Sequence, residues 1–485
     1  MEAERKVNTM RAQIQVLSDD EIQAIHAESL RILAEVGVRF HSQRARNLMQ
    51  ASGAQVDHET KIVRIPAELV EHALAAAPKS FLLGARLPEM DLPLPAGTSG
   101  YVLDNGGIYT RDHHTGERRI ASYQDNMEFL KVFEALPFSA LVWPTTVHEF
   151  HPRSAGVKAC MASFMHSCLH IQDELNGPEE VPLIIEALEC ILGSQQAVRE
   201  RKLYSVVYCT LPPLGHDGPM CDAYLELGAY EVPICVFPMP CSGSTGPASL
   251  FSNIAMGNAE ALSALVLFQL ARPGTPIIFG DASGPTDFRT GNFLEGSPEM
   301  VLQTAARGEM ARFYGLPNEQ AGCLTDAKDH GAQAVLEKVA TTLPLFLSGV
   351  DLIQGPGALD TSNTMSLAQI VVDDEIAGYC QRIRQGVEVS PQKDYFEDIL
   401  AVQPGGHFLG RANTRKAARS AEFFQPGLAD RSAYSRWLEL GRPDLYEQAK
   451  VKVDEILAAP PRYPLPDDVA GKLEELMHRA DEVLA

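Results

Sequence analysis

Eight short apolar or β-branched runs, each followed by a longer stretch of helical periodicity, occupy residues 100 to 390. This alternation is typical of β-α units that build a parallel sheet. The runs expected to form strands are YVLDN (101–105), ALVWPTT (140–146), CLHIQD (168–173), LYSVVYC (203–209), VPICVFP (232–238), PIIFGD (276–281), NEQAGC (318–323) and DLIQG (351–355). Eight such units within about 290 residues predict an α/β fold of the (β/α)8 TIM-barrel type.

The helices of these units are expected near residues 124–136, 154–166, 179–196, 218–229, 247–271, 297–314, 331–347 and 365–388. An open, doubly wound sheet is the alternative arrangement of the same units. It is disfavoured because no glycine-rich dinucleotide or phosphate-binding motif follows the first run.

The segments on either side of the barrel differ from it in pattern. Residues 1–98 predict a mainly helical segment that packs on the catalytic barrel of residues 99–390, and residues 391–485 predict an extension that is irregular and then helical. Inside the barrel, the alternating stretch 107–122 carries a Thr115-Gly116 turn and predicts an inserted β-hairpin. This hairpin is expected either at the site or at a subunit contact.

Composition and charge exclude several classes of partner. The formal net charge of −22 argues against binding to nucleic acid or to an anionic membrane surface. No apolar stretch approaches the roughly 18 residues of a membrane span, and the first residues lack the apolar core of a signal peptide, so a cytoplasmic protein is expected. The nine cysteines form no C-x-x-C pair, which favours free thiols, and no motif predicts a protein-bound metal.

Candidate site residues follow from the rule that chemistry in such barrels collects at the C-terminal ends of the strands. The candidate catalytic residues are Asp104, Asp281, Asp326 and His330. The candidate substrate-binding residues are Tyr101, Asn105, Trp143, Tyr208, Phe237, Phe279, Arg289, Gln354 and His407. Rings combined with carboxylates and few bases suit a cation that cannot donate hydrogen bonds, such as a quaternary ammonium group, although each ring taken alone is more often a core residue.

The stretch GCLTDAKDHGAQAVLEK (322–338) concentrates charge between the seventh strand and its helix. Apolar positions of the helix share one face, which leaves Lys328 and Lys338 for solvent. Asp326 and His330 are expected to line the site, and Asp329 is expected to cap the helix.

Two further candidates each have two open explanations. Arg289 lies in the polar loop after the sixth strand, where it could bind a substrate carboxylate or form a salt bridge to Asp287 or Glu295. His407, flanked by glycines in GGHFLG, could face the site or satisfy its own loop.

Six segments together resemble one family of enzymes. They are LSDDEIQAIHAESLRILAEVGVRF (17–40), IYTRDHHTGERRIAS with YQDN (108–126), TDFRTGNFLEGSPE (286–299), TDAKDHGAQAVLEK (325–338), VVDDEI (371–376) and QPGGHFLG (403–410). In this order they resemble the trimethylamine methyltransferase superfamily, specifically the members without pyrrolysine, which include glycine betaine methyltransferase.

The resemblance implies a (β/α)8 methyltransferase that moves a methyl group from an N-methylated amine to a corrinoid, which enters as cob(I)alamin and leaves as methylcobalamin. The corrinoid belongs to a cognate partner corrinoid protein, so this chain supplies binding and alignment. Founding members carry pyrrolysine in the cavity, whereas this sequence has only the twenty standard residues. A quaternary ammonium leaves as a neutral tertiary amine and needs no special acid, so glycine betaine or a similar betaine is favoured over trimethylamine.

Three functions therefore remain to be compared: a quaternary amine methyltransferase, a methyltransferase for another methylated amine such as trimethylamine, and a non-catalytic betaine-binding protein. In the implied arrangement Asp104, Asp281 and the rings hold the ammonium group, and Arg289 or His407 takes the carboxylate. A homo-oligomer is expected.

Overall fold

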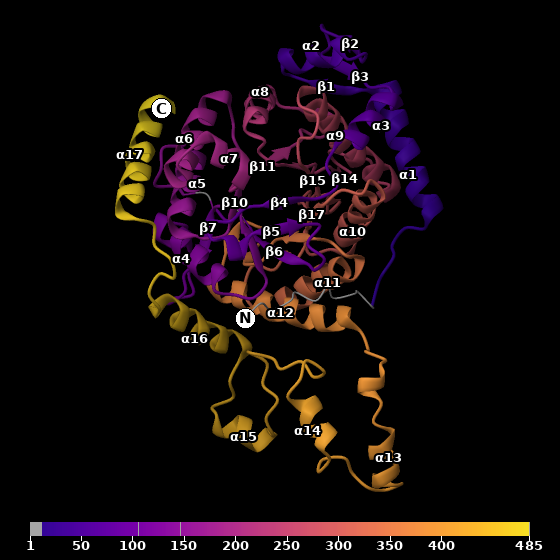
Figure 1. Cartoon of the computed structure of the whole chain (residues 1–485), viewed down its shortest axis with the longest axis vertical. Helices are drawn as coiled ribbons and strands as arrows, with labels where there is room; N and C mark the ends of the chain where they lie inside the picture. Colours follow the sequence, from indigo (N-terminus) through magenta and orange to yellow (C-terminus); the bar gives the residue numbers. More distant parts are fainter. Residues whose placement is uncertain (1–11, 105, 146, 485) are drawn as a thin grey trace.

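The computed structural model describes residues 12–104, 106–145 and 147–484, and its centre is a closed barrel of eight parallel strands (Figure 1). Around the barrel the strands are β6 (Gly100–Leu103), β9 (Ser139–Val142), β10 (His170–Asp173), β11 (Tyr204–Cys209), β13 (Ile234–Phe237), β15 (Ile277–Asp281), β17 (Asn318–Ala321) and β18 (Leu352–Gln354), which pairs with β6. Each strand overlaps one of the eight predicted runs. The prediction of a (β/α)8 barrel is confirmed.

A ring of helices surrounds the barrel. These helices are α4 (Tyr123–Glu134), α5 (Ala155–His166), α6 (Val181–Leu192), α7 (Gln195–Arg201), α8 (Gly218–Leu227), α9 (Leu250–Ala271), α10 (Pro298–Phe313), α11 (Ala332–Ser348) and α12 (Leu367–Gln385). Helix α10 begins as its sequence indicates, because the Ser297 side chain accepts a hydrogen bond from the Met300 amide and Pro298 occupies the first turn.

Helix α9 is the one described helix that is long and apolar enough to cross a membrane. In the fold, 89% of its most apolar 18-residue window is buried inside the protein. Burial of this extent is typical of a helix in the core of a globular domain.

The leading segment combines helices with small sheets. Its helices are α1 (Asp19–Arg31), α2 (Gln43–Ala51) and α3 (Ala67–Ala76), and its strands are β1 (Val38–Phe40), β2 (Gln55–Asp57), β3 (Ile62–Arg64), β4 (Phe81–Leu83) and β5 (Leu92–Leu94). Ser18 and Glu21 form a reciprocal capping box at the start of α1. A single π-helical turn (Ile32–Val36) follows α1, and Gly37, at φ 79°, ends it. Strand β12 (Gly215–His216), from the loop after β11, pairs with β1 and joins this segment to the barrel.

The loops after β6 and β18 meet at the C-terminal end of the barrel. The hairpin of β7 (Tyr109–Arg111) and β8 (Arg118–Ile120), which lies within residues 107–122, pairs through β7 with β20 (Thr364–Met365), and β20 pairs with β19 (Ala358–Leu359). Strands β14 (Cys241–Ser242) and β16 (Gly284–Pro285) similarly join the loops after β13 and β15. These small sheets build the wall of the barrel mouth.

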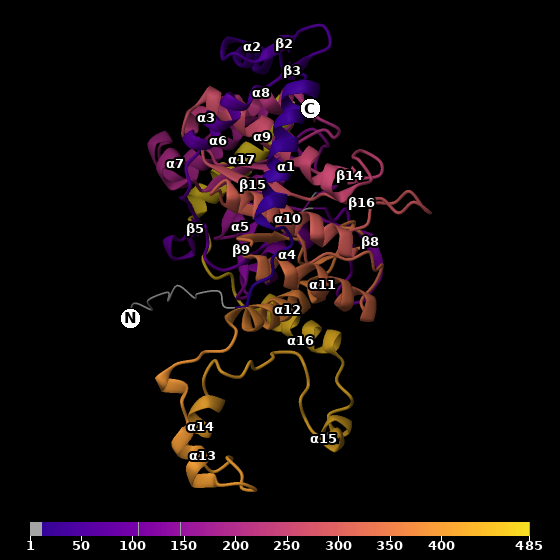
Figure 2. The same cartoon turned by 90° about the vertical axis from the view of Figure 1, so that its right-hand side faces the viewer.

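The C-terminal extension leaves the body and returns to it. Helices α13 (Phe396–Val402), α14 (Ala412–Ala418) and α15 (Tyr434–Glu439) project beyond α12 in both views (Figures 1 and 2). Helix α16 (Leu445–Ala458) then packs on α12 and α4, and α17 (Asp467–Leu484) packs on α5 and α6. Short 3-10 turns occur at Pro88–Met90, Pro178–Glu180, Gly228–Tyr230 and Pro391–Lys393.

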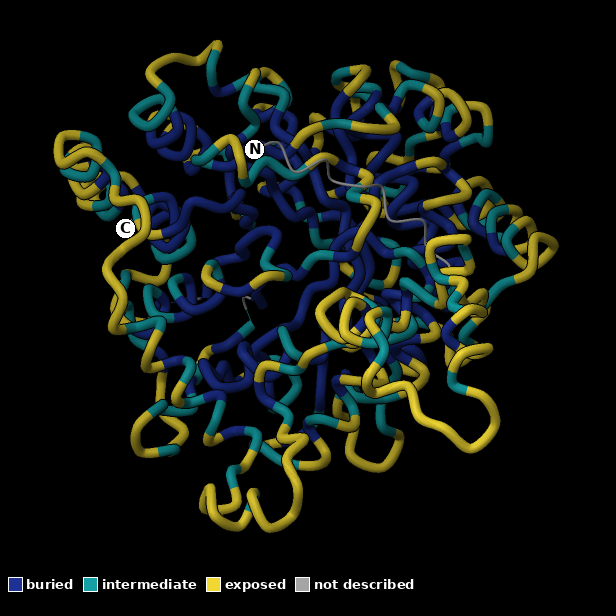
Figure 3. The backbone as a smooth tube through the Cα atoms, turned by 60° about the horizontal axis from the view of Figure 1, so that its bottom comes forward, coloured by how far each residue is buried: buried dark blue, intermediate teal, exposed yellow. Residues whose placement is uncertain are grey.

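Burial follows these layers. Backbone in the barrel and on the inner faces of its helices is buried, and exposed backbone lies at the periphery (Figure 3). All nine cysteines are free thiols, as the sequence predicts, and six of them are buried.

Candidate active site

Two aromatic rings face each other inside the barrel. Trp143, which follows β9, and Phe237, at the end of β13, have ring centroids 6.1 Å apart in an edge-to-face arrangement. Strands β10 and β11 lie between β9 and β13, so the rings meet across the barrel interior. A Cβ atom on Gly280 would lie 2.3 Å from the Phe237 ring, so the missing side chain makes room for that ring.

The other three predicted rings lie outside the barrel. The Tyr101 hydroxyl donates to the Asp373 carbonyl on α12, Tyr208 packs on Phe268 of α9, and Phe279 packs on Tyr314 after α10. The expectation that Tyr101, Tyr208 and Phe279 line the site is therefore corrected. Side chains alternate between the two faces of a strand, and these three fall on the face that the helices cover.

Asp281 also points away from the barrel interior. Its carboxylate accepts a hydrogen bond from the Arg307 guanidinium of α10 at 3.2 Å and from the Ser283 hydroxyl at 2.8 Å, and both charged side chains are fully buried. The Arg307 guanidinium lies 4.7 Å from the centre of the Phe279 ring. Asp281 is thus the internal counter-ion of Arg307, which corrects its expected catalytic role.

Asp104 occupies the inward face at the end of β6, beside two side chains from other loops. Its carboxylate accepts hydrogen bonds from the Gly106 amide at 2.6 Å, the Ser362 hydroxyl at 3.2 Å and the Gln354 side-chain amide at 3.4 Å. The Ser362 hydroxyl also lies 2.8 Å from the Glu295 carboxyl. The structure therefore brings Asp104, Gln354, Ser362 and Glu295 together, and we call these four residues the carboxyl cluster.

Glu295 reaches this cluster because its loop crosses the barrel mouth. The loop leaves β15, and Asp104 follows β6, with β17 and β18 between them in the barrel. Asp326, after β17, accepts hydrogen bonds from the Glu295 amide at 2.9 Å and the Gly296 amide at 3.1 Å. Asp326 thus holds the backbone of Glu295 and acts as a positioning residue, which corrects the expectation that it lines the site directly.

The segment that carries Ser362 has an unusual backbone. Asp360, Thr361 and Ser362 have φ angles of 58°, 54° and 56°, which place three consecutive non-glycine residues in the left-handed region. This conformation costs free energy at each residue and persists only where surrounding contacts enforce it. Here the Thr361 hydroxyl donates to Asp326 at 3.1 Å and the Ser362 hydroxyl joins the carboxyl cluster. Strain of this kind is typical of functional sites.

The carboxyl groups of the cluster are shifted toward their neutral forms. Burial, together with the nearby Asp104 carboxylate, raises the pKa of Glu295 to about 8 against the lowering effect of the Ser362 hydrogen bond. Burial also raises the pKa of Asp104. Neither carboxyl forms an ion pair within the described part of the chain. The buried Lys338 ammonium, which is paired with Asp373, opposes both increases in pKa from outside the cluster. The four residues of the cluster themselves include no cation.

The basic and acidic groups of residues 322–338 have mainly structural roles. His330 Nε2 lies 2.7 Å from the Ser366 hydroxyl, its ring stacks on Tyr446 of α16, and burial lowers its pKa to about 4. His330 therefore contacts α16 instead of lining the site. Asp329 pairs with Arg111 of β7 and does not cap α11, whose cap residue Gly331 has no side chain.

Lys338 contradicts the expectation of an exposed side chain. It is fully buried, and its ammonium group lies 2.9 Å from the Asp373 carboxylate. The Asp373 pairing raises the pKa of Lys338 against the opposing effect of burial. Lys328, by contrast, is exposed as expected and pairs with Asp360.

Two of the candidates do not reach the cluster. The Arg289 side chain is 92% exposed at the tip of its loop, and its guanidinium lies 3.6 Å from Asp287, which is the salt-bridge alternative. His407 is exposed in the segment between α13 and α14, which project beyond α12 and away from the barrel (Figures 1 and 2). Asn105 lies outside the described residues.

Several polar atoms near the rings lack hydrogen-bond partners. The Trp143 indole N–H lies beside the Asp173 carboxyl, and the Thr145 hydroxyl follows it at the end of β9. Both are buried, and neither has a partner in normal hydrogen-bond geometry among the described residues. Deeper in the barrel, Gln172 and Cys235 lie beside the Glu319 carboxyl, yet neither oxygen of Glu319 has a partner in normal hydrogen-bond geometry. Burial raises the pKa of Glu319 to about 7. Unpaired buried polar groups are costly and mark a place where a ligand or water completes the structure.

Glu295 and Ser362 are not among the site residues predicted from the sequence. Glu295 precedes a clear helix start and is named only as a salt-bridge partner, and Ser362 lies in a loop without a motif. The polar, glycine-rich character of residues 283–299 is the signal that could have directed attention to that loop.

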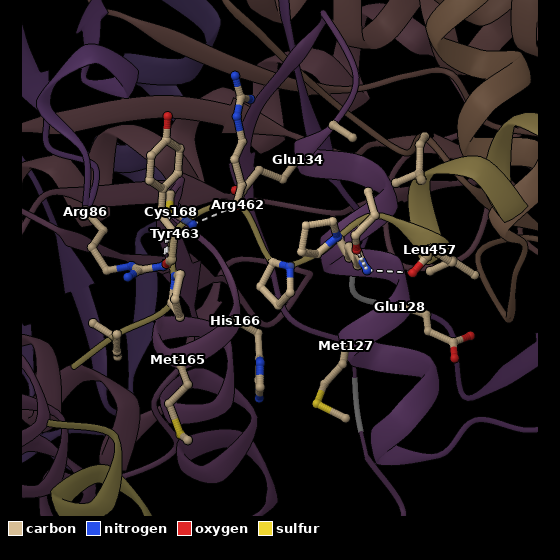
Figure 4. A pocket seen from close by; sticks show the side chains of 18 of the residues that line it. Arg86, Met127, Glu128, Glu134, Met165, His166, Cys168, Leu457, Arg462 and Tyr463 are labelled. Carbon is tan, nitrogen blue, oxygen red and sulfur yellow. Dashed lines mark hydrogen bonds between the residues drawn. The ribbon is translucent and has the colours of Figure 1, made fainter. Parts of the chain in front are cut away.

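Two other features lie away from the barrel interior. A cleft of about 790 Å³ lies where residues 459–465 cross α4 and α5, and Arg86, His166 and Tyr463 line it (Figure 4). The Arg86 guanidinium already donates hydrogen bonds to the Ser167 and Tyr463 carbonyls. On the surface, His113, His114 and Asp454 have ligand atoms within 4.8 Å of one another, close enough to share a metal ion.

The barrel brings carboxyl groups and aromatic rings together at the C-terminal ends of its strands, which is where enzymes of this fold hold their active sites. The model of the family described as trimethylamine methyltransferase (MTTB) matches residues 1–484, and the chain belongs to this family. The resemblance found in the sequence is therefore confirmed. The chain is a member of a methyltransferase family.

Individual relatives have different named substrates. The chain is 31% identical to a glycine betaine methyltransferase of Desulfitobacterium hafniense (strain Y51), over 96% of this chain and 98% of that protein. It is 28% identical to the trimethylamine methyltransferase MttB of Desulfitobacterium hafniense (strain DSM 10664 / DCB-2), over 96% of this chain and 94% of that protein. Among solved structures, the monomethylamine methyltransferase (MtmB) of Methanosarcina barkeri has a TM-score of 0.47 and 12% identity, over 99% of this chain and 96% of that chain.

Proposed function

We propose that the protein transfers a methyl group from a quaternary amine, glycine betaine or a similar betaine, to the corrinoid of a partner protein. The observation that carries the proposal is the buried carboxyl cluster. Asp104 and Glu295 share the Ser362 hydroxyl, and neither forms an ion pair within the described residues, where the buried Lys338 is already paired with Asp373. A cationic substrate would supply the missing charge.

The cluster suits a quaternary ammonium group in particular. Such a group has no N–H to donate, so it is held by charge and by the negative faces of aromatic rings. Trp143 and Phe237 provide two rings on the inward face of the same barrel end. A bound cation would also favour the ionised form of Glu295, so binding and proton release by this carboxyl are coupled.

The anionic end of a betaine needs donors. The Trp143 indole N–H, beside the Asp173 carboxyl, and the Thr145 hydroxyl are buried donors without a partner in normal hydrogen-bond geometry in the described chain. Both follow β9, the neighbour of β6. We assign the substrate carboxylate to these two donors. This assignment replaces Arg289 and His407, which the fold holds away from the cluster.

The corrinoid, when its carrier protein presents it, supplies the nucleophile for the methyl group. This chain's contribution is to hold the methylated nitrogen in line with the open end of the barrel and to exclude water from it. Leu211, Met239 and Phe288 are exposed apolar side chains in the loops after β11, β13 and β15, and they border that end. An apolar rim of this kind suits a docking protein.

The direct test is transfer of a methyl group in solution. Purified protein, glycine betaine and a carrier protein loaded with Co(I) corrinoid should yield the demethylated tertiary amine, measured by mass spectrometry, together with a change in the corrinoid absorbance. An Asp104→Asn variant should bind betaine more weakly. Absence of product with every betaine tested, using a carrier protein that is active with another methyltransferase, would contradict the proposal.

A methylamine substrate is the second candidate, and one observation favours it. Glu295, with its pKa of about 8, is protonated at neutral pH and could protonate a leaving amine. A panel containing betaines and trimethylamine would separate the two substrates. Betaine binding without turnover of any substrate would instead support a binding protein. For either enzyme we propose a cytoplasmic location, where nine free cysteines stay reduced.

A further inference from the structure

Residues 388–440 form an arm that leaves the body of the protein. Its helices α13, α14 and α15 have seven, seven and six residues, and none packs extensively on the barrel or on its ring of helices. Helices this short are not stable by themselves in water. Both views show the arm projecting beyond α12 and α16 (Figures 1 and 2).

The base of the arm is firmly attached. The Glu375 carboxylate of α12 accepts hydrogen bonds from the Gly427, Leu428 and Ala429 amides, and Arg382 donates to the Glu422 carbonyl. Within the arm, Arg411 pairs with Asp398 at 2.7 Å. The arm therefore has a defined shape and a defined exit from the body.

The arm exposes an unusual amount of apolar surface. The described chain has 29 exposed large hydrophobic residues, and ten of them lie in this arm, which is about a ninth of the chain. The ten are Val389, Phe396, Ile399, Leu400, Phe408, Leu409, Phe423, Tyr434, Leu438 and Leu440. Leu409 is 79% exposed and Phe396 is 60% exposed. A concentration of this kind marks a surface that a partner covers.

Charge distinguishes the arm from the body. The arm holds seven basic and seven acidic residues, so the remaining 34 basic and 56 acidic residues carry the whole net charge of −22. Around α14 the balance is positive, because residues 404–421 contain Arg411, Arg415, Lys416 and Arg419 and no acid. Arg415, Lys416 and Arg419 are exposed and form no ion pair within the described residues. The arm thus complements the charge of its own protein's body.

We propose that the arm of one molecule lies against the acidic body of a second copy of the same chain. The apolar residues of the arm need a stable partner, because a protein that binds only transiently would leave them exposed to water most of the time. A second copy is always present at the concentration of the chain itself. In a two-fold symmetric dimer, the arm of each copy packs on the body of the other copy. One symmetric interface then buries the apolar residues of both arms.

The first experiment measures mass in solution, with no other protein present. Light scattering after size exclusion should find the full chain as a dimer or a higher oligomer at micromolar concentration. Phe396→Asp/Leu409→Asp, on the arm, should weaken association by about 100-fold or more, because two charges would enter an apolar interface. Leu336→Asp/Val483→Asp, at exposed positions of α11 and α17, is the matched control and should leave the mass unchanged.

The second experiment tests charge complementarity. Arg415→Glu/Lys416→Glu should weaken association and make it less dependent on salt, whereas Arg31→Glu/Lys472→Glu changes the net charge equally on exposed helices of the body and should not. Circular dichroism checks that each variant remains folded. A lysine cross-linker applied to mixed light- and heavy-isotope chains should join Lys416 of one copy to the body of the other.

Each outcome decides for or against the second copy. A monomeric wild-type chain, or arm variants that keep the wild-type mass, would overturn the proposal. So would cross-links from Lys416 that form only when a corrinoid carrier protein is added, because the arm would then be a docking surface for that protein. None of these readouts requires methyl transfer, so the test stands apart from that of the proposed function.

Discussion

Asp104 and Asp281 are both buried aspartates at the ends of barrel strands, and the fold gives them opposite roles. Asp281 points toward α10 and pairs with Arg307. Asp104 points into the barrel, where it shares Ser362 with Glu295 and forms no ion pair among the described residues. The difference is one step in the alternation of side chains along a strand.

The comparison shows how an identical residue at an equivalent place can be structural or functional. In a buried ion pair, each charge compensates the cost of burying the other. Removing one partner leaves the other charge buried without a counter-ion, which destabilises the fold. An unpaired buried carboxyl costs stability and is retained where a ligand completes it. Stability and activity should therefore respond oppositely to changes at the two positions.

The largest expected effect is on stability at the paired site. Asp281→Ala should lower the free energy of unfolding by about 3–5 kcal/mol, because it leaves the buried Arg307 without a counter-ion. Denaturant unfolding would measure this, with the exposed-loop variant Asp287→Ala as the control. If Asp281→Ala unfolds at the same denaturant concentration as the control, the comparison fails. Asp281→Leu/Arg307→Met should recover much of the loss.

The next effect is on activity at the unpaired site. Asp104→Asn should lower kcat/KM for betaine by about 100-fold, which corresponds to roughly 2.7 kcal/mol of transition-state stabilisation. Its thermal stability should be equal to or higher than that of the wild type, since a buried charge without a partner is removed. An Asp104→Asn protein that is less stable but fully active would assign Asp104 a structural role like that of Asp281.

A pH series sharpens the same contrast. Glu295 has a pKa of about 8 in the fold and an ordinary value near 4.5 when unfolded, so the folded state holds its proton more tightly. Its stability contribution is complete below about pH 4.5 and is lost as the pH rises through 8, by up to roughly 1.4 kcal/mol per pH unit. Glu295→Gln should flatten this part of the curve, measured as the free energy of unfolding from pH 5 to 9. Betaine binding by the wild type should strengthen over the same range.

The smallest effect is expected at the loop tip. The Arg289 side chain is almost fully exposed, and its pairing with Asp287 is at the surface, so Arg289→Ala should change stability by less than about 0.5 kcal/mol. The KM for betaine should stay within about twofold. A large rise in KM would show that the loop closes over the substrate and that Arg289, not Trp143 and Thr145, binds the carboxylate.

Much of the barrel was predictable because its periodicity is local. Eight apolar runs became eight strands, and helix starts such as Ser297-Pro298 follow from capping chemistry within one turn. The leading segment was read as mainly helical, whereas three-residue strands such as β1 and β3 depend on pairing with distant β12 and carry little signal of their own. Lys338 was placed in solvent by helix periodicity, but a buried acid on the next helix, Asp373, holds it inside.

The candidate site was predictable only in part. Asp104, Trp143, Phe237 and Gln354 were selected as strand-end residues, and the structure places them on the inward face. The same rule also selected Tyr101, Tyr208, Phe279 and Asp281. A strand end gives the position of a residue along the barrel axis, but it does not say whether the side chain points inward or toward the helices. Glu295 was missed since its position depends on a loop that crosses two strands and is held by Asp326.

The sequence by itself determined the barrel, the family and the acidic character of the site, since hydrophobic period, motif order and composition are properties of the chain. Only the tertiary structure decided which carboxylates meet and which are neutralised. Each buried charge takes its role from the partner that long-range packing brings to it, and Asp104 and Asp281 differ in this respect alone.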